Sequence, residues 1–569
     1  MYAVIDIETT GLNRFEDDIT MLGIGIYKDL EDPGRIATID MRTEPNGWDR
    51  FRNIIRKARE HKAKVVWQNG KFDTLFIDEK QGYMLPIHHD VMLMGTAYEM
   101  VAEHGLKAMA QKYLGVEDWD IDKKTKLGNG DPAKLKSYLR LDVKYTWELF
   151  KFFYERMNKT QKKVYKELLL PAYKMYRQTE KNGIYIDQEG LEKVRKEYKK
   201  KEADALAVLT GKYDINWNSP QQVQDVFFNQ EKLPCLKLSE KTGKPSADAK
   251  VLKKLASQGH ELPNLLLDYK FYYGAGSKFL SRWGGYAKYD GRIHPNFNIT
   301  NVVTGRTSCS DPNLQQVPRN KDLRSLFHAP PGRVFLEADY SQIELRVAAH
   351  YAQEPNMLRI YREGGDIHTE TARTLCGGEP TKEERNKAKA VNFGFLYGMG
   401  AKGFVNYAFD SYGVVFTPDE AERYRDLFFQ KYSKLLVWHD KMEKLCEANG
   451  GVSNLFGRFR ALPKIYSQYK WERNEAVRRA INSPVQGTAS DLLLSAAVQI
   501  ARELGEKYDL KIVGTVHDSI LADVPEEYAE ECVQEIRRIM AHPDALDKFG
   551  IEFSLPIDCD VGVGPWGTH

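Results

Sequence analysis

The stretch VFLEADYSQIELRVAAH, residues 334–350, constrains the fold of this chain more than any other. Residues 334–336 are apolar and have strand character, and from Ile343 the apolar and small residues recur with helical spacing. Asp339 stands at this junction. A carboxylate at the end of a buried strand can hold a metal ion that also binds phosphates. Because an aspartate that caps the following helix is a commoner feature, other segments must decide between the two interpretations.

The composition is that of an ordinary globular protein. A chain of 569 residues holds roughly three to five units of about 150 residues each. Its 42% hydrophobic and 29% charged residues leave ample material for a core. The net charge of +3 excludes a general polycation. A nucleic-acid-binding protein of this composition therefore has to gather its basic residues on one face.

The cysteines and the apolar runs restrict the cellular setting. The six cysteines are scattered and form no CxxC pair, which argues against a zinc site and a disulfide framework and favours a reducing compartment. No apolar run approaches the length of a membrane span, and no secretory signal is recognisable at Met1. We therefore expect a soluble protein of the cytoplasm without a membrane partner.

Acidic residues mark the first part of the chain, residues 1–150. The segment Tyr2–Ile7 is predicted as a buried strand, so that Asp6 and Glu8 project from one side of it. In VVWQNGKFDTLFI, Asp73 follows an apolar run and an Asn-Gly turn. Two carboxylates that converge from one strand are able to hold a divalent cation. Taken alone, each of these residues is more commonly a solvated charge or a helix cap than a metal ligand.

A third acidic segment, YLRLDVKYTWELF, has a helical pattern that places Tyr138 and Asp142 on one face. The set then holds four carboxylates and one phenol that can orient a water molecule. This inventory suits phosphodiester hydrolysis with two metal ions, which stabilise the attacking and the leaving oxygens. The joint pattern, rather than any single residue, favours this interpretation over solvated charges.

A stripe of cations and aromatic residues occupies ERNKAKAVNFGFLYGMG, residues 384–400. Its members recur every four residues and are Arg385, Lys389, Phe393 and Tyr397. On one helix face, two cations and two aromatic rings suit a nucleoside triphosphate, because the cations neutralise phosphates and the rings stack on sugar and base. An amphipathic helix with core aromatics and two solvated cations is the alternative.

The segment KIVGTVHDSILADV, residues 511–524, is predicted as a β-hairpin. Two alternating apolar runs flank a turn that carries Asp518 at its tip. We expect the turn to bring this carboxylate beside Asp339 on a neighbouring strand. Two aspartates with two metal ions would assist attack by a primer 3′-hydroxyl on an α-phosphate and the departure of pyrophosphate. The alternative is an exposed aspartate of a turn.

Helices are predicted between the acidic first part and this second half. Residues 151–179 are predicted as one helix, and residues 191–206 as a long charged helix with a basic run. A solvated helix face and a contact with duplex phosphates are both open for that run.

The segments DIETT, NGKFD and YLRLD resemble the three motifs of the DEDD superfamily of 3′–5′ exonucleases, in its tyrosine-bearing branch. The resemblance implies a ribonuclease H-like domain that binds a single-stranded 3′ end. It also implies that the four carboxylates bind two metal ions and that Tyr138 positions the nucleophilic water. The four carboxylates are Asp6, Glu8, Asp73 and Asp142.

The second half resembles the A-family DNA polymerases, the group of bacterial polymerase I. DYSQIELR, the pattern R-x3-K-x3-F-G-x2-Y-G and HDS match motifs A, B and C. TGRTSCSDPNLQQVPR resembles the segment before the palm strand, and RRAINSPVQGTASD a helix that contacts the minor groove and the template. The resemblance spans essentially the whole chain. It implies a multidomain α/β and α+β protein in which an exonuclease domain precedes a right hand of palm, fingers and thumb.

The resemblance implies a role for each matched position of the polymerase half. The implied metal ligands are Asp339, Asp518 and the backbone carbonyl of Tyr340. The residues implied to bind or select the nucleotide, among which Lys389 also takes part in catalysis and Glu344 excludes a ribose 2′-hydroxyl, are Arg385, Lys389, Phe393, Tyr397, His368, Gln342 and Glu344. The residues implied to contact primer or template are Arg306, Arg478, Asn482, Gln486 and His517.

The same resemblance implies domain boundaries. The expected order is exonuclease domain 1–150, connector and thumb 151–300, first part of the palm 301–355, fingers 356–480 and second part of the palm 481–569.

Two departures from the family pattern matter. Motif C normally reads His-Asp-Glu, and here Ser519 replaces the glutamate, as in single-subunit RNA polymerases. Glu344, the Phe393-Gly394 pair and the exonuclease motifs argue against an RNA polymerase. The second departure is that no 5′-nuclease is expected before the exonuclease, which together with the length predicts a phage-type enzyme.

We therefore predict a DNA polymerase that copies a primed template from deoxynucleoside triphosphates and proofreads with a 3′–5′ exonuclease, in DNA replication. Two Mg²⁺ ions are expected in each centre, with Mn²⁺ as a substitute. A monomer in the bacterial host cytoplasm is expected, and a processivity factor, a helicase and a single-strand-binding protein are candidate partners. A relative of the single-subunit RNA polymerases and a nuclease whose polymerase half only clamps DNA stay open as alternatives.

Overall fold

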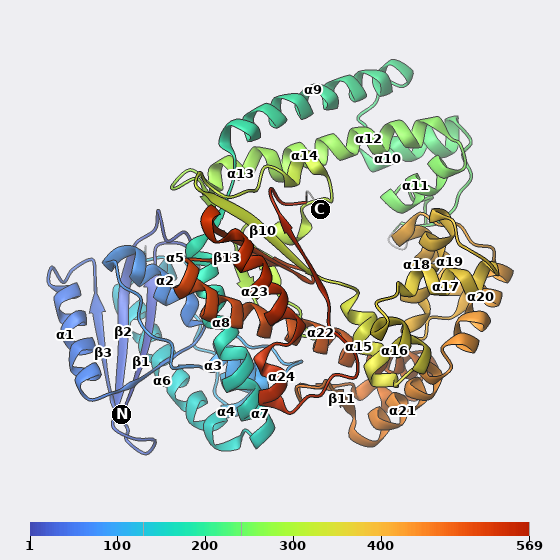
Figure 1. Ribbon diagram of the computed structural model, residues 1–569. Coiled ribbons are helices and arrows are strands. Elements are labelled where there is room, and N and C mark those ends of the chain that lie inside the picture. Colours follow the sequence, from blue (N-terminus) through green and yellow to red (C-terminus); the bar gives the residue numbers. More distant parts are fainter. Residues whose placement is uncertain (129, 240–241, 568–569) are drawn as a thin grey trace. The chain divides into compact units, whose positions relative to one another are not determined.

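The computed structural model describes residues 1–128, 130–239 and 242–567 and combines helices with several small sheets (Figure 1). The chain forms two compact units. The first unit comprises Met1–Asn182, Pro295–Gln315 and Leu336–Val563, and the second comprises Gly183–His294, Gln316–Phe335 and the chain from Gly564. The mixed α/β class predicted from the sequence is confirmed. The end of the predicted second palm segment, residues 568–569, lies outside the described residues.

The first part of the first unit is built on a five-stranded sheet with the order β3-β2-β1-β4-β5. The strands are β1 (Tyr2–Thr9), β2 (Ile19–Tyr27), β3 (Arg35–Asp40), β4 (Lys64–Trp67) and β5 (His89–Asp90). β1, β2 and β3 run antiparallel, whereas β4 is parallel to β1 and β5 is parallel to β4. The predicted strand Tyr2–Ile7 is therefore confirmed as β1, which is drawn in blue in Figure 1.

Helices surround this sheet, and one of them packs directly on its first three strands. The helices are α1 (Gly47–Glu60), α2 (Gly70–Gln81), α3 (Val91–Tyr98), α4 (Leu106–Leu114), α5 (Lys123–Lys126) and α6 (Pro132–Arg156). α6 contacts β1, β2 and β3. A Cβ atom at Gly23 of β2 would lie 2.9 Å from side-chain carbons of Leu139 and Val143, so glycine is what permits this close approach. This packing places α6, which carries Tyr138 and Asp142, against β1.

The prediction of a single helix for residues 151–179 is wrong, because Met157 and Asn158 are not helical and separate two helices. α6 continues past residue 150 to Arg156, and a new helix, α7 (Lys159–Val164), then begins. The side chain of Asn158 accepts a hydrogen bond from the backbone N–H of Gln161, whose side chain bonds back to the N–H of Asn158. This capping box fixes a new helix start. A π-helical turn, Tyr165–Leu169, then leads into α8 (Leu170–Asn182).

A second sheet in the first unit has the order β13-β14-β10-β15. Its strands are β10 (Arg333–Tyr340), β13 (Lys511–Val516), β14 (Ser519–Pro525) and β15 (Cys559–Val563). β13 and β14 form the antiparallel hairpin predicted from the sequence, and β10 and β15 are antiparallel. The long helix α22 (Lys470–Tyr508) and α23 (Ala529–Ala541) pack against these strands, and α24 (Asp544–Phe549) contacts α22.

Helices that follow β10 form the remaining part of the first unit. They are α15 (Ile343–Ala352), α16 (Pro355–Arg362), α17 (Ile367–Cys376), α18 (Lys382–Leu396), α19 (Ala401–Tyr412), α20 (Pro418–Lys431) and α21 (Lys434–Asn449). Thr381 and Thr417 begin α18 and α20 with capping boxes. Two short antiparallel pairs complete the unit, β11 (Gly451–Ser453) with β12 (Phe459–Ala461) and β8 (Asn296–Asn298) with β9 (Ser308–Ser310).

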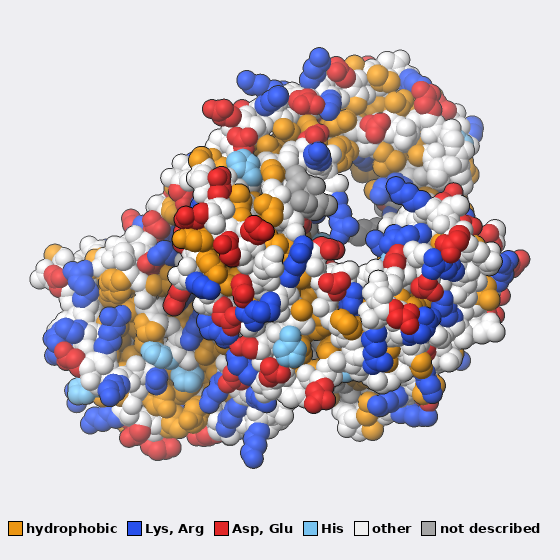
Figure 2. Space-filling view, in the orientation of Figure 1, with side chains coloured by type: hydrophobic (Ala, Val, Ile, Leu, Met, Phe, Trp, Pro, Cys, Tyr) orange, Lys and Arg blue, Asp and Glu red, His pale blue; other side chains and the backbone are white. Residues whose placement is uncertain are grey.

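The second unit is largely helical. Its elements are α9 (Gln188–Lys212), α10 (Pro220–Gln224), α11 (Ala249–Ser257), α12 (Glu261–Ala275), α13 (Ser281–Tyr286), α14 (Lys321–Arg324), π-helical turns at Asp225–Gln230 and Gly276–Leu280, and the pair β6 (Ile184–Tyr185) with β7 (Arg292–Ile293). Trp217, Phe227, Leu252 and Leu266 lie in its core. Figure 2 shows basic and acidic side chains alternating over α9, whose predicted charged face is therefore a mixed one. No helix of the described residues is long and apolar enough to cross a membrane.

A buried ion pair joins α22 to the β11–β12 hairpin. Asp491 accepts hydrogen bonds of 2.6 Å from Arg458 Nη1 and from Asn454 Nδ2, and the Arg458 and Asp491 side chains are 4% and 0% exposed. Burial raises the pKa of the Asp491 carboxyl, and the guanidinium opposes that rise.

We expect Asp491→Ala to lower the free energy of unfolding by about 3–5 kcal/mol, because the Arg458 guanidinium would be left buried without its charge partner. Asp440→Ala is the matched control, since Asp440 pairs with Lys444 at 2.6 Å on the surface and such pairs contribute less than about 1 kcal/mol. Thermal unfolding followed by circular dichroism measures both. Equal shifts in Tm for the two variants would contradict this prediction.

Candidate active sites

Three carboxylates meet beside the first sheet. Asp6 and Glu8 project from β1, and Asp142 projects from α6. One carboxylate oxygen from each lies within 4.8 Å of those of the other two. Asp142 is buried and the other two are half-buried. Oxygen ligands at this separation suit a hard divalent cation, so the sequence prediction that these three residues converge is confirmed.

Asp73 is the fourth carboxylate of this centre. It lies in the first turn of α2, is 4% exposed, and accepts a hydrogen bond of 3.1 Å from the backbone N–H of Ile7 on β1. The preceding Asn69 has φ +59°, in the left-handed region. A Cβ atom at Gly70 would lie 2.4 Å from Trp67, so only glycine fits there. The predicted Asn-Gly turn therefore directs Asp73 to the β1 carboxylates.

Burial raises the pKa of every carboxyl group in this cluster. Desolvation is the largest cause for all four, and the pKa reaches about 8 for Glu8, about 8 for Asp73 and about 6 for Asp142, with that of Asp6 well above its usual range. The charges of Asp73 and Asp142 add to the effect at Asp6 and Glu8. A divalent cation relieves such repulsion, so the donor set fits a metal.

Lys107 and Trp119, which no sequence motif indicated, complete this centre through hydrogen bonds to Tyr138 and Asp142. Tyr138, one turn before Asp142, accepts a hydrogen bond of 3.1 Å from Lys107 Nζ. Trp119 Nε1 donates to Asp142 Oδ1 at 2.6 Å. Burial raises the pKa of the Tyr138 phenol, so the group stays neutral and able to donate. Lys107 and Trp119 belong to α4 and to the loop after it, and no spacing in the sequence relates them to α6.

The second acidic centre lies on the β13-β14-β10-β15 sheet. The backbone N–H of Tyr340 donates to the carbonyl of Asp518 at 3.2 Å, and Ser519 Oγ donates to Asp339 Oδ1 at 3.0 Å. The hairpin therefore places Asp518 beside Asp339 as predicted. His517 is exposed and has φ +57°, which closes the two-residue turn. The Tyr340 side chain is buried and donates to the carbonyl of Met540 at 3.0 Å, whereas its backbone N–H contacts Asp518.

A further carboxylate lies at this centre. Asp560 of β15 pairs directly with Asp339 in the antiparallel register, so their side chains share one face of the sheet. Like charges directly opposite each other are unfavourable without a cation. The donor set of this centre therefore also fits a divalent metal. Because strand order is not readable from spacing, Asp560 was not selected from the sequence.

The stripe predicted for residues 385–397 lies on α18 and its end. Arg385, Lys389 and Phe393 are helical, and Tyr397 follows the last residue of the helix. Arg385 Nε donates to Asp366 Oδ2 at 2.6 Å. Although burial alone would raise the pKa of the Asp366 carboxyl, the bond from Arg385 holds it well below its usual range. Lys389 is half-exposed.

Residues of motif A and of the segment before it contact this stripe. The Tyr397 hydroxyl donates to Glu344, and Arg306 forms an ion pair with the same carboxylate. Arg306 therefore lies beside Glu344 and the stripe, and its contact with DNA stays a prediction. Gln342 has φ +56° and accepts a hydrogen bond of 3.1 Å from the Tyr361 hydroxyl.

His368 is packed into this site. Its ring is 3% exposed and lies 5.8 Å from that of Phe393, and Asn392 Nδ2 donates to its Nδ1 at 2.8 Å. Burial lowers the pKa of His368 to about 4. The imidazole is therefore neutral at physiological pH and has only Nε2 for a phosphate oxygen.

The residues predicted to contact DNA on α22 share one face. Arg478, Asn482 and Gln486 follow one another at four-residue spacing, with Arg478 exposed and the other two half-buried. Asn482 Oδ1 is buried without a partner among the described residues. This row of donors and acceptors suits base edges or sugars, and its role stays a prediction.

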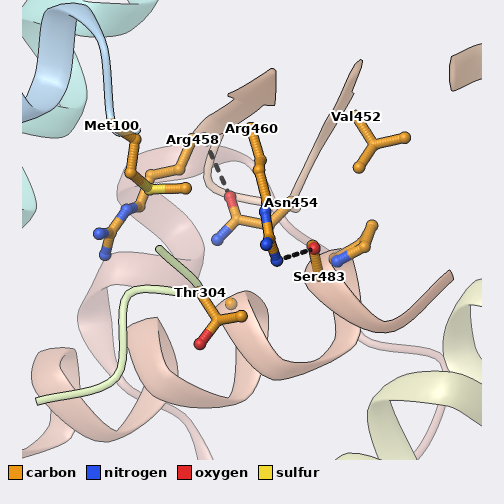
Figure 3. A pocket seen from close by; sticks show the side chains of 9 residues that line it. Met100, Thr304, Val452, Asn454, Arg458, Arg460 and Ser483 are labelled. Carbon is orange, nitrogen blue, oxygen red and sulfur yellow. Dashed lines mark hydrogen bonds between the residues drawn. The ribbon is translucent and has the colours of Figure 1, made fainter. Parts of the chain in front are cut away.

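A small cavity lies between the first part of the unit and α22 (Figure 3). Met100, Thr304, Asn454, Arg458 and Arg460 are among its lining residues, and Arg460 Nη1 donates to Ser483 Oγ at 2.7 Å. Its volume of about 10 Å³ is room for about one water molecule. The cavity can therefore take one water molecule and is too small for a nucleotide.

We expect the first acidic cluster to bind Mn²⁺ more tightly as the pH rises from about 6 to about 8, the range of the raised pKa values of Asp142, Glu8 and Asp73. A cation must displace the protons that these carboxyls retain at low pH, which changes the affinity about tenfold per pH unit for each proton displaced. Electron paramagnetic resonance of free Mn²⁺ measures this in an Asp518→Asn background. Glu8→Gln should bind more weakly and with less pH dependence, and a pH-independent affinity of the parent would contradict the prediction.

Comparisons with known proteins place these centres in two families. Residues 187–568 match the family described as DNA polymerase family A, and residues 2–158 match the 3′–5′ exonuclease family. DNA polymerase I of Pseudomonas aeruginosa is 31% identical over 98% of this chain and 62% of its own length. That of Borreliella burgdorferi is 30% identical over 100% and 62%. The thermostable DNA polymerase I of Thermus filiformis is 35% identical over 73% and 49%.

A solved structure shares the fold of the whole chain. The polymerase domain of Pol1 from M. smegmatis, in a complex described as containing DNA primer-template and dNTP, superposes with a TM-score of 0.82. The sequence identity is 23%, and the match covers 100% of this chain and 95% of the other. The expected order of an exonuclease domain and a polymerase is confirmed. This chain, which spans only 49–62% of the length of the three curated relatives, belongs to DNA polymerase family A and carries a 3′–5′ exonuclease domain in residues 2–158.

Proposed function

We propose that this protein extends a DNA primer on a template from deoxynucleoside triphosphates and removes nucleotides from the primer 3′ end at a separate editing centre. The observation that carries the proposal is the juxtaposition of Asp339 in β10 and Asp518 in the β13–β14 turn, which are far apart in the sequence. Hydrogen bonds between their neighbours hold them together, from Ser519 Oγ to Asp339 Oδ1 at 3.0 Å and from the Tyr340 N–H to the Asp518 carbonyl at 3.2 Å. The structural relative described with primer-template and dNTP supports these substrates.

Divalent metal ions are general in both families, and the carboxylate sets here fit them. We propose two Mg²⁺ ions per centre, replaceable by Mn²⁺. Asp339, Asp518 and the carbonyl of Tyr340 would hold them in the polymerase centre, and the four clustered carboxylates of the exonuclease domain would do so in the editing centre. When bound, such ions lower the pKa of the attacking hydroxyl or water and neutralise the leaving oxygen.

The chain's own side chains bind and orient the nucleotide. Lys389 and the two Nη groups of Arg385 can donate to the triphosphate, because Asp366 engages the Nε of Arg385. Tyr397 and Arg306 fix the Glu344 carboxylate, which then occupies the space a ribose 2′-hydroxyl would need. The primer 3′-hydroxyl attacks the α-phosphate, and pyrophosphate leaves towards the Arg385 and Lys389 side.

The editing centre orients water with its phenol. Tyr138 is fixed by Lys107 and lies one turn from Asp142. Its neutral hydroxyl can donate to a water molecule that attacks the terminal phosphodiester of a single-stranded 3′ end. The separation of this centre from Asp339 and Asp518 makes the two activities separately removable by mutation.

We further propose a role in DNA replication as a cytoplasmic monomer, with a processivity factor, a helicase or a single-strand-binding protein as a partner. The support is that synthesis and editing motifs share one chain, which suits accurate copying. Analytical ultracentrifugation tests the monomer, and pull-down with the chain as bait tests the partners.

A primed-template assay with Mg²⁺ tests the main proposal. We expect wild type to extend the primer with deoxynucleotides, Asp518→Asn only to shorten it, and Asp73→Ala to extend it without shortening, because each variant removes one carboxylate of one centre. Primer shortening by wild type at every deoxynucleotide concentration would favour a nuclease that only clamps DNA. Preferential incorporation of ribonucleotides would favour a relative of the RNA polymerases.

We expect Ser519→Ala to slow single-turnover nucleotide addition roughly tenfold, because the Asp339 carboxylate loses a hydrogen bond that orients it. Ser519→Thr retains the hydroxyl and is the matched control. Exonuclease activity of both variants provides an internal standard, since Ser519 lies outside the editing centre. Nucleotide addition at the wild-type rate by Ser519→Ala would show that this hydrogen bond does not orient Asp339 for catalysis.

A further inference from the structure

The Asn69–Asp73 segment of the editing centre is held by side chains that lie outside the exonuclease domain. Tyr173 of α8 donates from its hydroxyl to Asn69 Oδ1 at 3.0 Å and accepts from the backbone N–H of Lys71 at 3.1 Å. Tyr173 is 2% exposed. One buried phenol thus engages two residues of the turn that leads to Asp73.

A buried ion pair makes a second connection to the same segment. The Lys71 side chain is 5% exposed, and its ammonium contacts the carboxylate of Glu180 on α8 and the carbonyl of Phe297 on β8. Glu180 is 7% exposed and accepts a hydrogen bond of 2.7 Å from the backbone N–H of Phe297. Lys71 is two residues from Asp73, so this network fixes the first turn of α2.

Helix α8 is itself fixed on the strand that leads to Asp518. The Tyr176 hydroxyl lies 2.8 Å from Thr515 Oγ1 on β13, and Asn182 Nδ2 donates to the carbonyl of Ile512 at 2.9 Å. α8 contacts both α2 and β13 (Figure 1). Helix α8 therefore fixes the position of the Asn69–Asp73 segment relative to the sheet of the polymerase centre.

A gain in stability does not explain why the Lys71–Glu180 ion pair is buried. Removing two charges from water costs about as much as their attraction returns, so a buried ion pair of this kind adds little net stability. It does impose one geometry, because the Lys71 ammonium and Glu180 Oε1 both meet fixed partners. A less buried ion pair, Lys181 with Asp78 at 2.6 Å and with side chains 46% and 10% exposed, joins α8 and α2 further along the helix and supplies a natural comparison.

We propose that Tyr173, Lys71 and Glu180 are positioning residues of the editing centre, which set the place of Asp73 by tying its segment through α8 to the polymerase sheet. The inference rests on the proposed editing function. It predicts that the exonuclease domain depends on residues beyond its own family match, 2–158, for a working geometry.

The main test separates positioning from stability with the double variant Lys71→Met/Glu180→Gln. Each single change leaves a buried charge without its partner and should lower Tm, whereas the double change removes both charges and should restore Tm. We expect the double variant to retain primer extension and the KM for a single-stranded oligonucleotide, but to degrade that oligonucleotide roughly 10- to 100-fold more slowly when it is saturating. Recovery of this maximal rate together with Tm would overturn the proposal.

Tyr173→Phe provides an independent variant, because it removes only one oxygen from a packed ring. We expect several-fold slower degradation with Tm and primer extension retained, and Lys181→Met should leave all three unchanged. If the double variant fails to fold, wild-type degradation by Tyr173→Phe overturns the proposal and slower degradation supports it. Asp73→Ala distinguishes failure of the proposed editing function from failure of the positioning role. If this variant still degrades primers, the proposed editing function fails, whatever the α8 variants do.

Discussion

Repulsion between carboxylates that must lie close together is the constraint on which the rest of this structure depends. Carboxylates in a buried site resist ionisation: burial is the main cause of the raised pKa values of Glu8 and Asp73, and the charges of Asp142 and Asp73 raise that of Glu8 further. The fold opposes this repulsion with donors that belong to neighbouring elements. Ile7 N–H bonds Asp73, and Ser519 Oγ bonds Asp339. The protein therefore holds the carboxylates of both centres in place without a cation.

Backbone conformation contributes to the same end. Asn69, Gln342 and His517 have φ between 56° and 59°, although none of them is glycine. Each lies within four residues of a carboxylate of one of the two centres. A left-handed conformation costs a non-glycine residue on the order of 1 kcal/mol, and hydrogen bonds such as that from Tyr173 to Asn69 offset it. At these three positions the strained backbone lies next to a carboxylate of one of the two centres, although other non-glycine residues such as Lys62 and Asp509 also have positive φ.

The sequence predicted those parts of the sites that lie within one element. Asp6 with Glu8, and Tyr138 with Asp142, follow from strand and helix periods, and the hairpin that carries Asp518 follows from its alternating pattern. Lys107, Trp119 and Asp560 were missed because their relation to the carboxylates depends on which elements pack together. The break at Asn158 was missed for a different reason: a capping box four residues long is a weaker signal than the helical periodicity on both of its sides.

The proposed nucleotide site shows how a chain with a net charge of +3 can concentrate cations without a strongly basic surface. Arg306 is paired with Glu344, and Arg385 with Asp366. These carboxylates hold the guanidinium groups in place and lower the cost of gathering positive charge before a nucleotide arrives. A triphosphate would then meet guanidinium groups that are already oriented. Because a guanidinium has five donors in a planar fork, it can keep one carboxylate and still receive a phosphate. Selectivity for the correct ligand in this arrangement comes from geometry more than from net charge.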